Sequence, residues 1–184
     1  MHSRLKNALV GATALLLIGA NTARAQVGMT SNLATVALTA TKAATLTVTP
    51  AASVSTLASI ADGSNANVFT PVSLTTAWNL SAGSSVRLVG WFGTPAQALA
   101  NGTDFIPSSK VEGRVNATAY APFTGAPVGT VGVAGGTLQL FNQSIAASSY
   151  GSRTDQLDLR LDLTGTTTMA GAYTGTLNLQ AIVQ

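Results

Sequence analysis

Apolar and polar residues alternate with a period of two over most of this chain, and this alternation constrains its fold more than any other feature. Between residues 34 and 48 every even position except Lys42 is apolar, and threonine fills most of the odd positions. Successive side chains of a β-strand point to opposite faces, so a period of two predicts strands with one buried and one exposed face. Almost no segment after residue 25 has the helical period of 3.6 residues.

Further segments with strand-like alternation follow at short intervals, and turn residues separate them. Residues 86–92 are apolar on both faces, which predicts a central strand, and Thr94-Pro95 predicts a single helical turn at 96–100. Eight or nine short strands with frequent turns are typical of an antiparallel sandwich, so we expect an all-β, immunoglobulin-like (pilin-like) β-sandwich. The other predicted strands are 43–49, 54–60, 72–80, 113–120, 128–133, 137–145, 157–163 and 173–183.

The last two of these strands carry the clearest pattern in the chain. Leucines occupy every odd position from 157 to 163, and apolar residues recur at alternate positions from 177 to 183. A Thr/Gly-rich turn lies between the two segments. Because one register would bury both leucine rows together, we predict that these strands pair as a hairpin.

The first 25 residues have the three parts of an export signal. Arg4 and Lys6 precede an apolar run at residues 8–20, and Ala23-Arg24-Ala25 supplies small residues at a cleavage site. The run is shorter than the roughly 20 residues that span a bilayer, and no later segment is apolar enough to do so. We therefore expect a cleaved signal peptide at 1–25 and a mature chain without a membrane span. That chain would reside in the periplasm, on the cell surface or outside the cell.

Charge and composition exclude several classes of function for residues 26–184. This part holds six basic and six acidic residues, so it lacks the basic surface that nucleic acids or anionic membranes require. It contains no histidine and no cysteine, which removes Ser-His-Asp triads, thiol nucleophiles and the usual zinc ligands. We expect no enzymatic activity, no cofactor and no metal.

Carboxylates are the remaining acid–base groups, and their spacing does not fit glycoside hydrolysis. Asp158 and Asp162 share one face of a predicted strand about 13 Å apart, beyond the roughly 5–9.5 Å between the carboxyls of glycosidases. Arg160 lies between them, which favours an exposed Asp-Arg-Asp ladder. The spacing of a calcium loop is absent around Asp155 and Asp158.

The two tryptophans could provide a stacking surface for sugars. Trp78 shares a strand face with Leu74 and Leu80, which favours a core position. Trp91 lies on a strand that is apolar on both faces, so it is a possible ligand-stacking residue as well as a possible core residue.

The C-terminal segment resembles the closing strand of spore coat protein U-type domains and archaic chaperone–usher pilins. Ala170-Gly171-Ala172-Tyr173 precedes the alternating residues 174–183, and Gly171 lies fourteen residues from the C-terminus, as in chaperone–usher pilins. The resemblance covers about 12 residues. The chain lacks the disulfide common in those families and carries Val183 where the larger family favours an aromatic residue. The resemblance implies an incomplete sandwich that a strand from a neighbouring subunit completes, and an assembly chaperone as a further partner.

The sequence contains a segment that could be such a donor. Residues 26–42 form either the first strand of their own domain or an extension that pairs with a neighbour, and residues 43–184 form the sandwich domain. The donor candidates are Ala34, Val36, Leu38 and Ala40. We therefore expect a structural surface subunit that associates with itself into a fimbria-like filament. The alternative is a monomeric secreted module that recognises carbohydrate or another surface.

Overall fold

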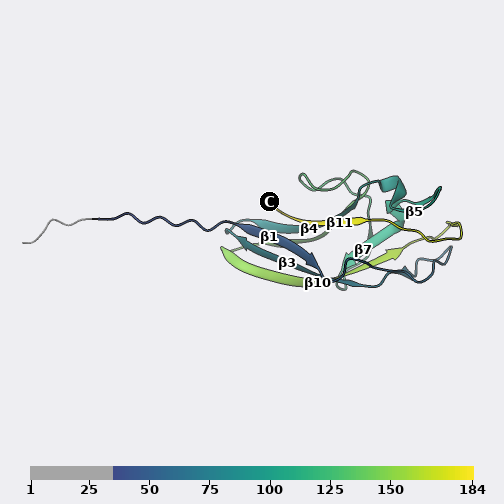
Figure 1. The fold of residues 1–184 in the computed structure, drawn as a ribbon, viewed down its shortest axis with the longest axis horizontal. Helices are drawn as coiled ribbons and strands as arrows, with labels where there is room; N and C mark the ends of the chain where they lie inside the picture. The colour runs from purple at the N-terminus through teal and green to yellow at the C-terminus, as the bar shows by residue number, and fades with distance from the viewer. Residues whose placement is uncertain (1–34) are drawn as a thin grey trace, which may run out of the picture. The chain divides into compact units, whose positions relative to one another are not determined.

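The computed structural model describes residues 35–184 of the chain, and Ala34 lies outside the described residues. The described residues fall in two units, which divide between Thr41 and Lys42. Within the first unit, residues 35–41 belong to no helix or strand and are exposed. All strands among residues 35–184 lie in the second unit (Figure 1). No helix in the described part of the chain is long and apolar enough to cross a membrane.

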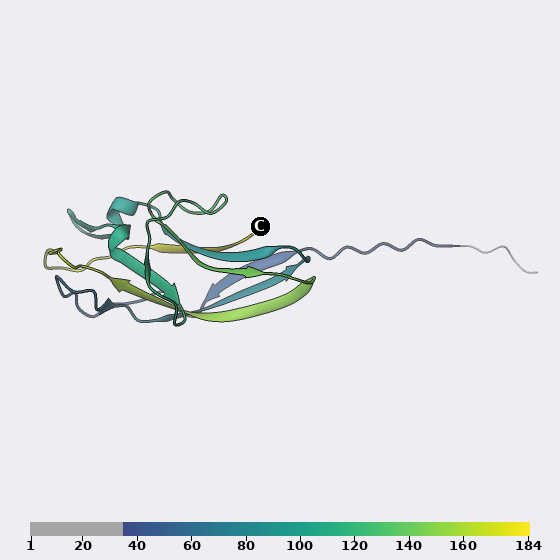
Figure 2. The ribbon, with the colours of Figure 1, turned by 180° about the vertical axis from the view of Figure 1, so that it is seen from behind.

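The second unit is an antiparallel β-sandwich, as the alternation predicts. One sheet has the strand order β1-β3-β10-β7-β8, with β2 paired to β10, and the other has the order β11-β4-β9. Figure 1 faces the edge formed by β1 and β11, and Figure 2 faces the opposite edge. The first sheet contains β1 (Thr45–Pro50), β2 (Asn67–Val68), β3 (Val72–Leu80), β7 (Val111–Val115), β8 (Ala121–Pro122) and β10 (Ser149–Leu161). The second contains β4 (Ser85–Phe92), β9 (Thr137–Ser144) and β11 (Leu177–Val183).

A small hairpin and two short 3₁₀ turns complete the unit. Strands β5 (Leu99–Asn101) and β6 (Asp104–Ile106) pair with each other. The turn η1 (Pro95–Gln97) lies where Thr94-Pro95 predicts a helical turn, although it ends before residue 100. The second turn, η2 (Ser108–Lys110), leads into β7.

The core lies between the two sheets and follows the alternation of the strands. The even positions of β3 are buried from Val72 to Leu80. Trp78 is 5% exposed, so its predicted core position is confirmed. Its indole lies across Gly151 on β10, where a Cβ atom would come within 2.9 Å of the ring. A glycine opposite the tryptophan therefore leaves the ring the space it needs.

Strand β4 occupies the predicted central position. It pairs with β11 on one side and with β9 on the other, and Val86 and Leu88 are fully buried in the core. Val89, whose side chain points to the other face, is fully buried too. The two-sided apolar pattern of this strand thus reflects burial on both faces.

The predicted C-terminal hairpin is wrong. β10 pairs with β3 and β7 in the first sheet, whereas β11 pairs with β4 in the second. Both leucine rows do face one core, because Leu157 is buried and Leu177 and Leu179 pack against the same cluster. Alternation identifies the buried face of a strand, but two strands with matched faces can meet across a sandwich as well as side by side.

Three of the weaker strand predictions also need correction. Residues 54–60 form no strand, and 128–133 form only an isolated bridge between Val128 and Val131. The strand expected at 113–120 is β7, which ends at Val115 because Asn116 adopts a positive φ of 55°. Local apolar content does not distinguish an irregular segment packed on a sheet edge from a paired strand.

Candidate functional site

The charged residues of the first sheet pair with one another and form no catalytic arrangement. The exposed Asp-Arg-Asp ladder is wrong: Asp158 is 5% exposed and accepts a hydrogen bond from Arg114 Nε on β7 at 3.0 Å. Arg160 Nε binds Glu112 Oε2 at 2.6 Å instead of either neighbouring aspartate. Residues 35–184 contain no group of three or more His, Cys, Asp or Glu side chains that could hold a metal.

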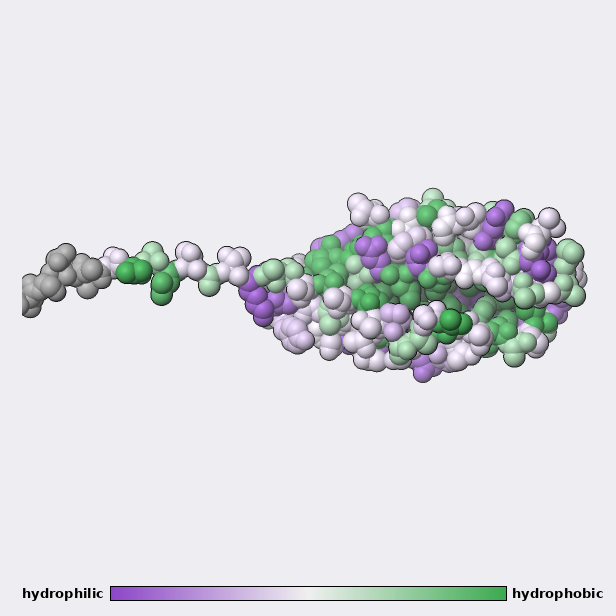
Figure 3. Space-filling model, viewed as in Figure 1, coloured by the Kyte–Doolittle hydropathy of each residue, from purple (hydrophilic) through white to green (hydrophobic). Residues whose placement is uncertain are grey.

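A long cleft opens where the two sheets meet along the β1–β11 edge. One part of it, about 330 Å³, lies between residues 50–55 and residues 175–179. The other part, about 830 Å³, lies between residues 54–62 and residues 168–175. Val54, Phe69 and Leu99 line both parts, so the two parts form one continuous cleft. Figure 3 shows hydrophobic residues gathered along the middle of this face.

The floor of the cleft is the hydrophobic core itself. Side chains from both sheets reach it, including Phe92 of β4, Val111 of β7, and Leu157 and Leu159 of β10. Of the residues that line this part, Phe92, Val111 and Leu157 are at most 4% exposed, whereas Leu159, Leu177 and Leu179 are half-buried. The half-buried side chains give the cleft its apolar surface, and such surface is typical of an interaction site or a ligand groove.

Leu177 and Leu179 of β11 line the smaller part of the cleft, and this strand has a free edge. It pairs with β4 alone, so no strand in the described part of the chain bonds to its other side. Its inward residues Leu177, Leu179 and Ala181 are only half-buried. Unpaired N–H and C=O groups along such an edge are a template for pairing with another strand.

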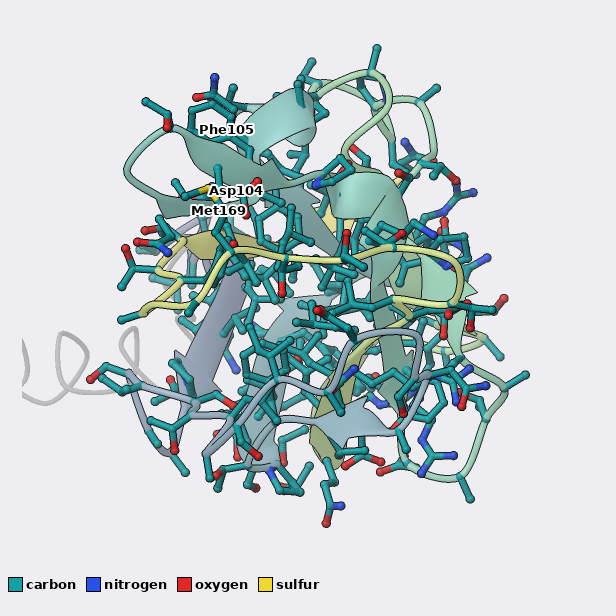
Figure 4. The ribbon with its side chains drawn as sticks, turned by 90° about the vertical axis from the view of Figure 1, so that its right-hand side faces the viewer. Asp104, Phe105 and Met169 are labelled. Atoms are coloured by element: carbon teal, nitrogen blue, oxygen red, sulfur yellow. The ribbon has the colours of Figure 1, made fainter. Side chains whose placement is uncertain are left out.

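Two aspartates fix the loop that forms the outer wall of the cleft. Asp104 of β6 accepts hydrogen bonds from the Tyr173 hydroxyl and the Met169 N–H, and these bonds lower the pKa of Asp104. Desolvation and then the bond to Asp104 raise the pKa of Tyr173. Asp62 Oδ1 accepts from Thr168 N and Oγ1 at 3.0 and 2.7 Å. In Figure 4, Asp104 lies between Phe105 and Met169, both exposed.

Glycines let this loop approach the β5–β6 hairpin closely. Gly171 has a φ of 148°, and a Cβ there would lie 2.2 Å from Asn101 Nδ2. A Cβ on Gly175 would lie 1.9 Å from the Ala98 carbonyl oxygen. The Gly171-Ala172-Tyr173-Thr174-Gly175 motif therefore has a structural role that its sequence does not reveal, because its contacts come from residues about 70 positions earlier.

The donor candidates that the structure describes are exposed. Val36 is 82% and Leu38 90% exposed, and Ala40 is exposed as well. Exposed apolar side chains at alternate positions suit pairing with another surface. Trp91 is half-buried on β4 and lines neither part of the cleft.

Sequence reasoning missed the residues that build the cleft. Phe69, Leu99 and Asp62 lie in irregular or very short segments, where no periodicity marks a buried or functional face. The apolar character of 54–60, interpreted as a strand, and the C-terminal motif with its alternating strand were the signals that pointed to this region.

No protein-family model matches this chain, and a search of curated proteins gave no match.

Proposed function

We propose that this protein is a non-catalytic, exported structural subunit whose cleft binds residues 34–41 of a second copy. Repeated along a row of copies, this strand donation builds a fimbria-like surface filament. The observation that carries the proposal is an apolar cleft beside the free edge of β11 in a chain that also presents an exposed, alternating apolar segment.

The strand order supports an immunoglobulin-like sandwich that lacks one strand. In immunoglobulin constant-type domains one sheet has the order A-B-E-D and the other contains G-F-C. Here the order β1-β3-β10-β7 parallels the first sheet, and β11-β4 parallels F-C. The place of G, beside F, corresponds to the free edge of β11. A donated strand at this edge would complete the second sheet.

The dimensions of segment and edge agree. Residues 34–41 extend about 26 Å as a strand, and the seven residues of β11 extend about 23 Å. No charged residue occurs between 25 and 41, so this segment enters an apolar cleft without burying a charge. Backbone hydrogen bonds to β11 would supply affinity, and apolar side chains at alternate positions would fill the cleft.

Export and assembly partners belong to the same proposal. The basic, apolar and small-residue parts of residues 1–25 support secretion to the periplasm or cell surface. A subunit with an open apolar cleft is prone to aggregate before it assembles, so an assembly chaperone that covers the cleft is a fitting partner.

The test is polymerisation of the exported protein. We expect wild-type chains to form fibres in negative-stain micrographs and multimers that resist sodium dodecyl sulfate. L38D places a charge on the face that enters the cleft and should abolish both. T39D, which places the same charge on the opposite face, is the matched control and should still assemble.

A monomeric wild-type chain at high concentration, or equal assembly of L38D and T39D, would refute strand donation. A monomer whose tryptophan fluorescence responds to a glycan would instead identify a secreted binding module.

A further inference from the structure

We propose that Lys42 of the donating copy pairs with Asp62 of the copy that accepts its segment, and that this ion pair sets the direction and register of the donated strand. The proposal rests on strand donation and adds to it the contact that orients the two copies.

Lys42 holds an isolated position in the sequence. It is the only charged residue between Arg24 and Asp62. By the period of two, its side chain follows Leu38 and Ala40 on the face that would enter the cleft. A charged side chain on this face must remain where the cleft meets water, so Lys42 marks the end of the buried part of the donor.

Asp62 is the matching group in the cleft. Among the described residues that line the two parts of the cleft, it carries the only formal charge. It is exposed, and it makes no ion pair with another described residue. Thr168 donates both of its hydrogen bonds to Oδ1, which leaves Oδ2 without a hydrogen bond to any described residue.

The two ends of the cleft differ in charge. Asp62 lies at the end where β11 begins, beside residues 168–175. At the other end, where β11 stops, Ser85 N donates a hydrogen bond to the Gln184 carbonyl. The acceptor's own Lys42 belongs to this end, because it immediately precedes Ala43, whose carbonyl accepts a hydrogen bond from Asn79. Basic and acidic residues therefore occupy opposite ends of this edge.

This asymmetry selects one direction for the donor. A donor parallel to β11 would bring its Lys42 beside the Lys42 of the acceptor, and like charges would repel. A donor antiparallel to β11 brings Lys42 to the Asp62 end. Antiparallel pairing is also slightly more stable per residue than parallel pairing. The same contact fixes the register, because a slip of two residues would bury Lys42 or withdraw an apolar side chain from the cleft.

The experiment is a charge exchange between full-length exported chains, with assembly followed by sedimentation at low salt. We expect K42E and D62K each to assemble with an apparent dissociation constant about three- to tenfold above wild type, because every junction then joins like charges. An equimolar mixture of K42E and D62K should assemble more tightly than either variant alone, since alternating chains restore opposite charges at each junction. In 1 M salt the differences should disappear.

Two controls separate this contact from a change in fold. D62N retains an oxygen that can accept the hydrogen bonds from Thr168, so it should keep the cleft wall intact. It should lose only the dependence of assembly on salt concentration. The K42Q variant should behave in the same way, and its substitution lies outside every strand. If wild type assembles and the mixture assembles no better than its components, the Lys42–Asp62 pair is wrong and strand donation stands. If wild type does not assemble, both proposals fail.

Discussion

The two long edges of the sandwich differ in whether side chains of the same chain cover the core between the two sheets. At the edge opposite β1 and β11, residues 149–156 of β10 extend beyond β7 and lie beside β9 of the other sheet. There Arg153 binds Asp155 with two hydrogen bonds of 2.6 Å, reaches Gln143 of β9 at 3.1 Å and stacks on Phe141 at 4.0 Å. This side chain connects the two sheets and covers the core between them. At the β1–β11 edge no side chain of residues 50–55 hydrogen-bonds to residues 175–179, and the two walls of the cleft are joined farther along, by the bonds from Thr168 to Asp62.

The difference shows at which edge a single chain covers its own core. A satisfied polar cluster over the core excludes water and leaves nothing to bind. An open apolar cleft beside a free strand edge leaves hydrophobic surface and backbone groups without partners, which a further strand can satisfy. The following predictions test this contrast, in order of decreasing effect.

Core residues between the edges should respond most strongly. Leu161 is fully buried, so L161A should lower the free energy of unfolding by about 2–5 kcal/mol, because it removes buried apolar contacts and leaves a cavity. Urea denaturation measures this loss. A loss below about 1 kcal/mol would show that the core around Leu161 is not packed as described.

The closed edge should depend on its ion pair. Asp155 is 3% exposed, and although burial alone would raise its pKa, hydrogen bonds from Arg153 and Asn116 lower it. D155A leaves Arg153 without its partner and should cost about 2–4 kcal/mol in urea denaturation. R114Q on the outer face removes a similarly exposed ion pair, but Gln156 Nε2 still donates to Asp158, so R114Q should cost less than D155A. Equal losses would mean that Arg153 does not close the edge.

The wall of the open edge should be sensitive to a single methyl group. In G175A the new Cβ would collide with the Ala98 carbonyl oxygen, and we expect a loss of about 1–3 kcal/mol together with altered amide shifts along 168–175. G93A is the matched control, because Gly93 has open space around its Cβ position and no positive φ. A neutral G175A would contradict the close approach of the loop to the hairpin.

The open edge itself should respond differently in isolated and assembled chains. Leu179 is half-buried, so L179A should cost only about 1 kcal/mol in a monomer, since little apolar area is lost from burial. In assembled material the same change should cost more, because the donated segment would cover Leu179. Equal losses in both states would show that nothing packs on this residue during assembly.

Acid should affect the wall least. The pKa of Asp104 is lowered below 3.8 by the bonds from Tyr173 and Met169, so its stabilising effect is complete above that pH. It is lost only as the pH falls through the lowered folded-state pKa. We expect the protection factor of the Met169 amide against hydrogen exchange to remain unchanged down to about pH 4 and to fall in stronger acid. A protection factor that already falls above about pH 5 would contradict the contact.

The sequence predicts the class of fold and the buried face of most strands. Alternation located β3, β4 and β9 and the core position of Trp78, because each depends on which residues of one segment face inward. It could not predict that β10 and β11 belong to different sheets, since both arrangements bury the same leucines.

The candidate site was less predictable than the fold. Its rim, β11, follows from alternation, but Asp62, Phe69 and Asp104 lie in irregular segments or a three-residue strand. Their importance arises from contacts with residues 168–175, far away in the sequence. The donor candidates Val36 and Leu38 were identified from the sequence and are exposed, and their pairing with another chain stays a prediction.

The most direct test of strand donation is a disulfide between two chains. The chain contains no cysteine, so L38C chains mixed with isotopically labelled L179C chains can form a heterologous bond only where donor and cleft meet. A disulfide requires Cα atoms within about 7 Å. We predict that mass spectrometry of oxidised assemblies finds the peptide of one chain linked to the labelled peptide of the other. Absence of this link in chains that do assemble, or its formation only within a single chain carrying both substitutions, would contradict strand donation between copies.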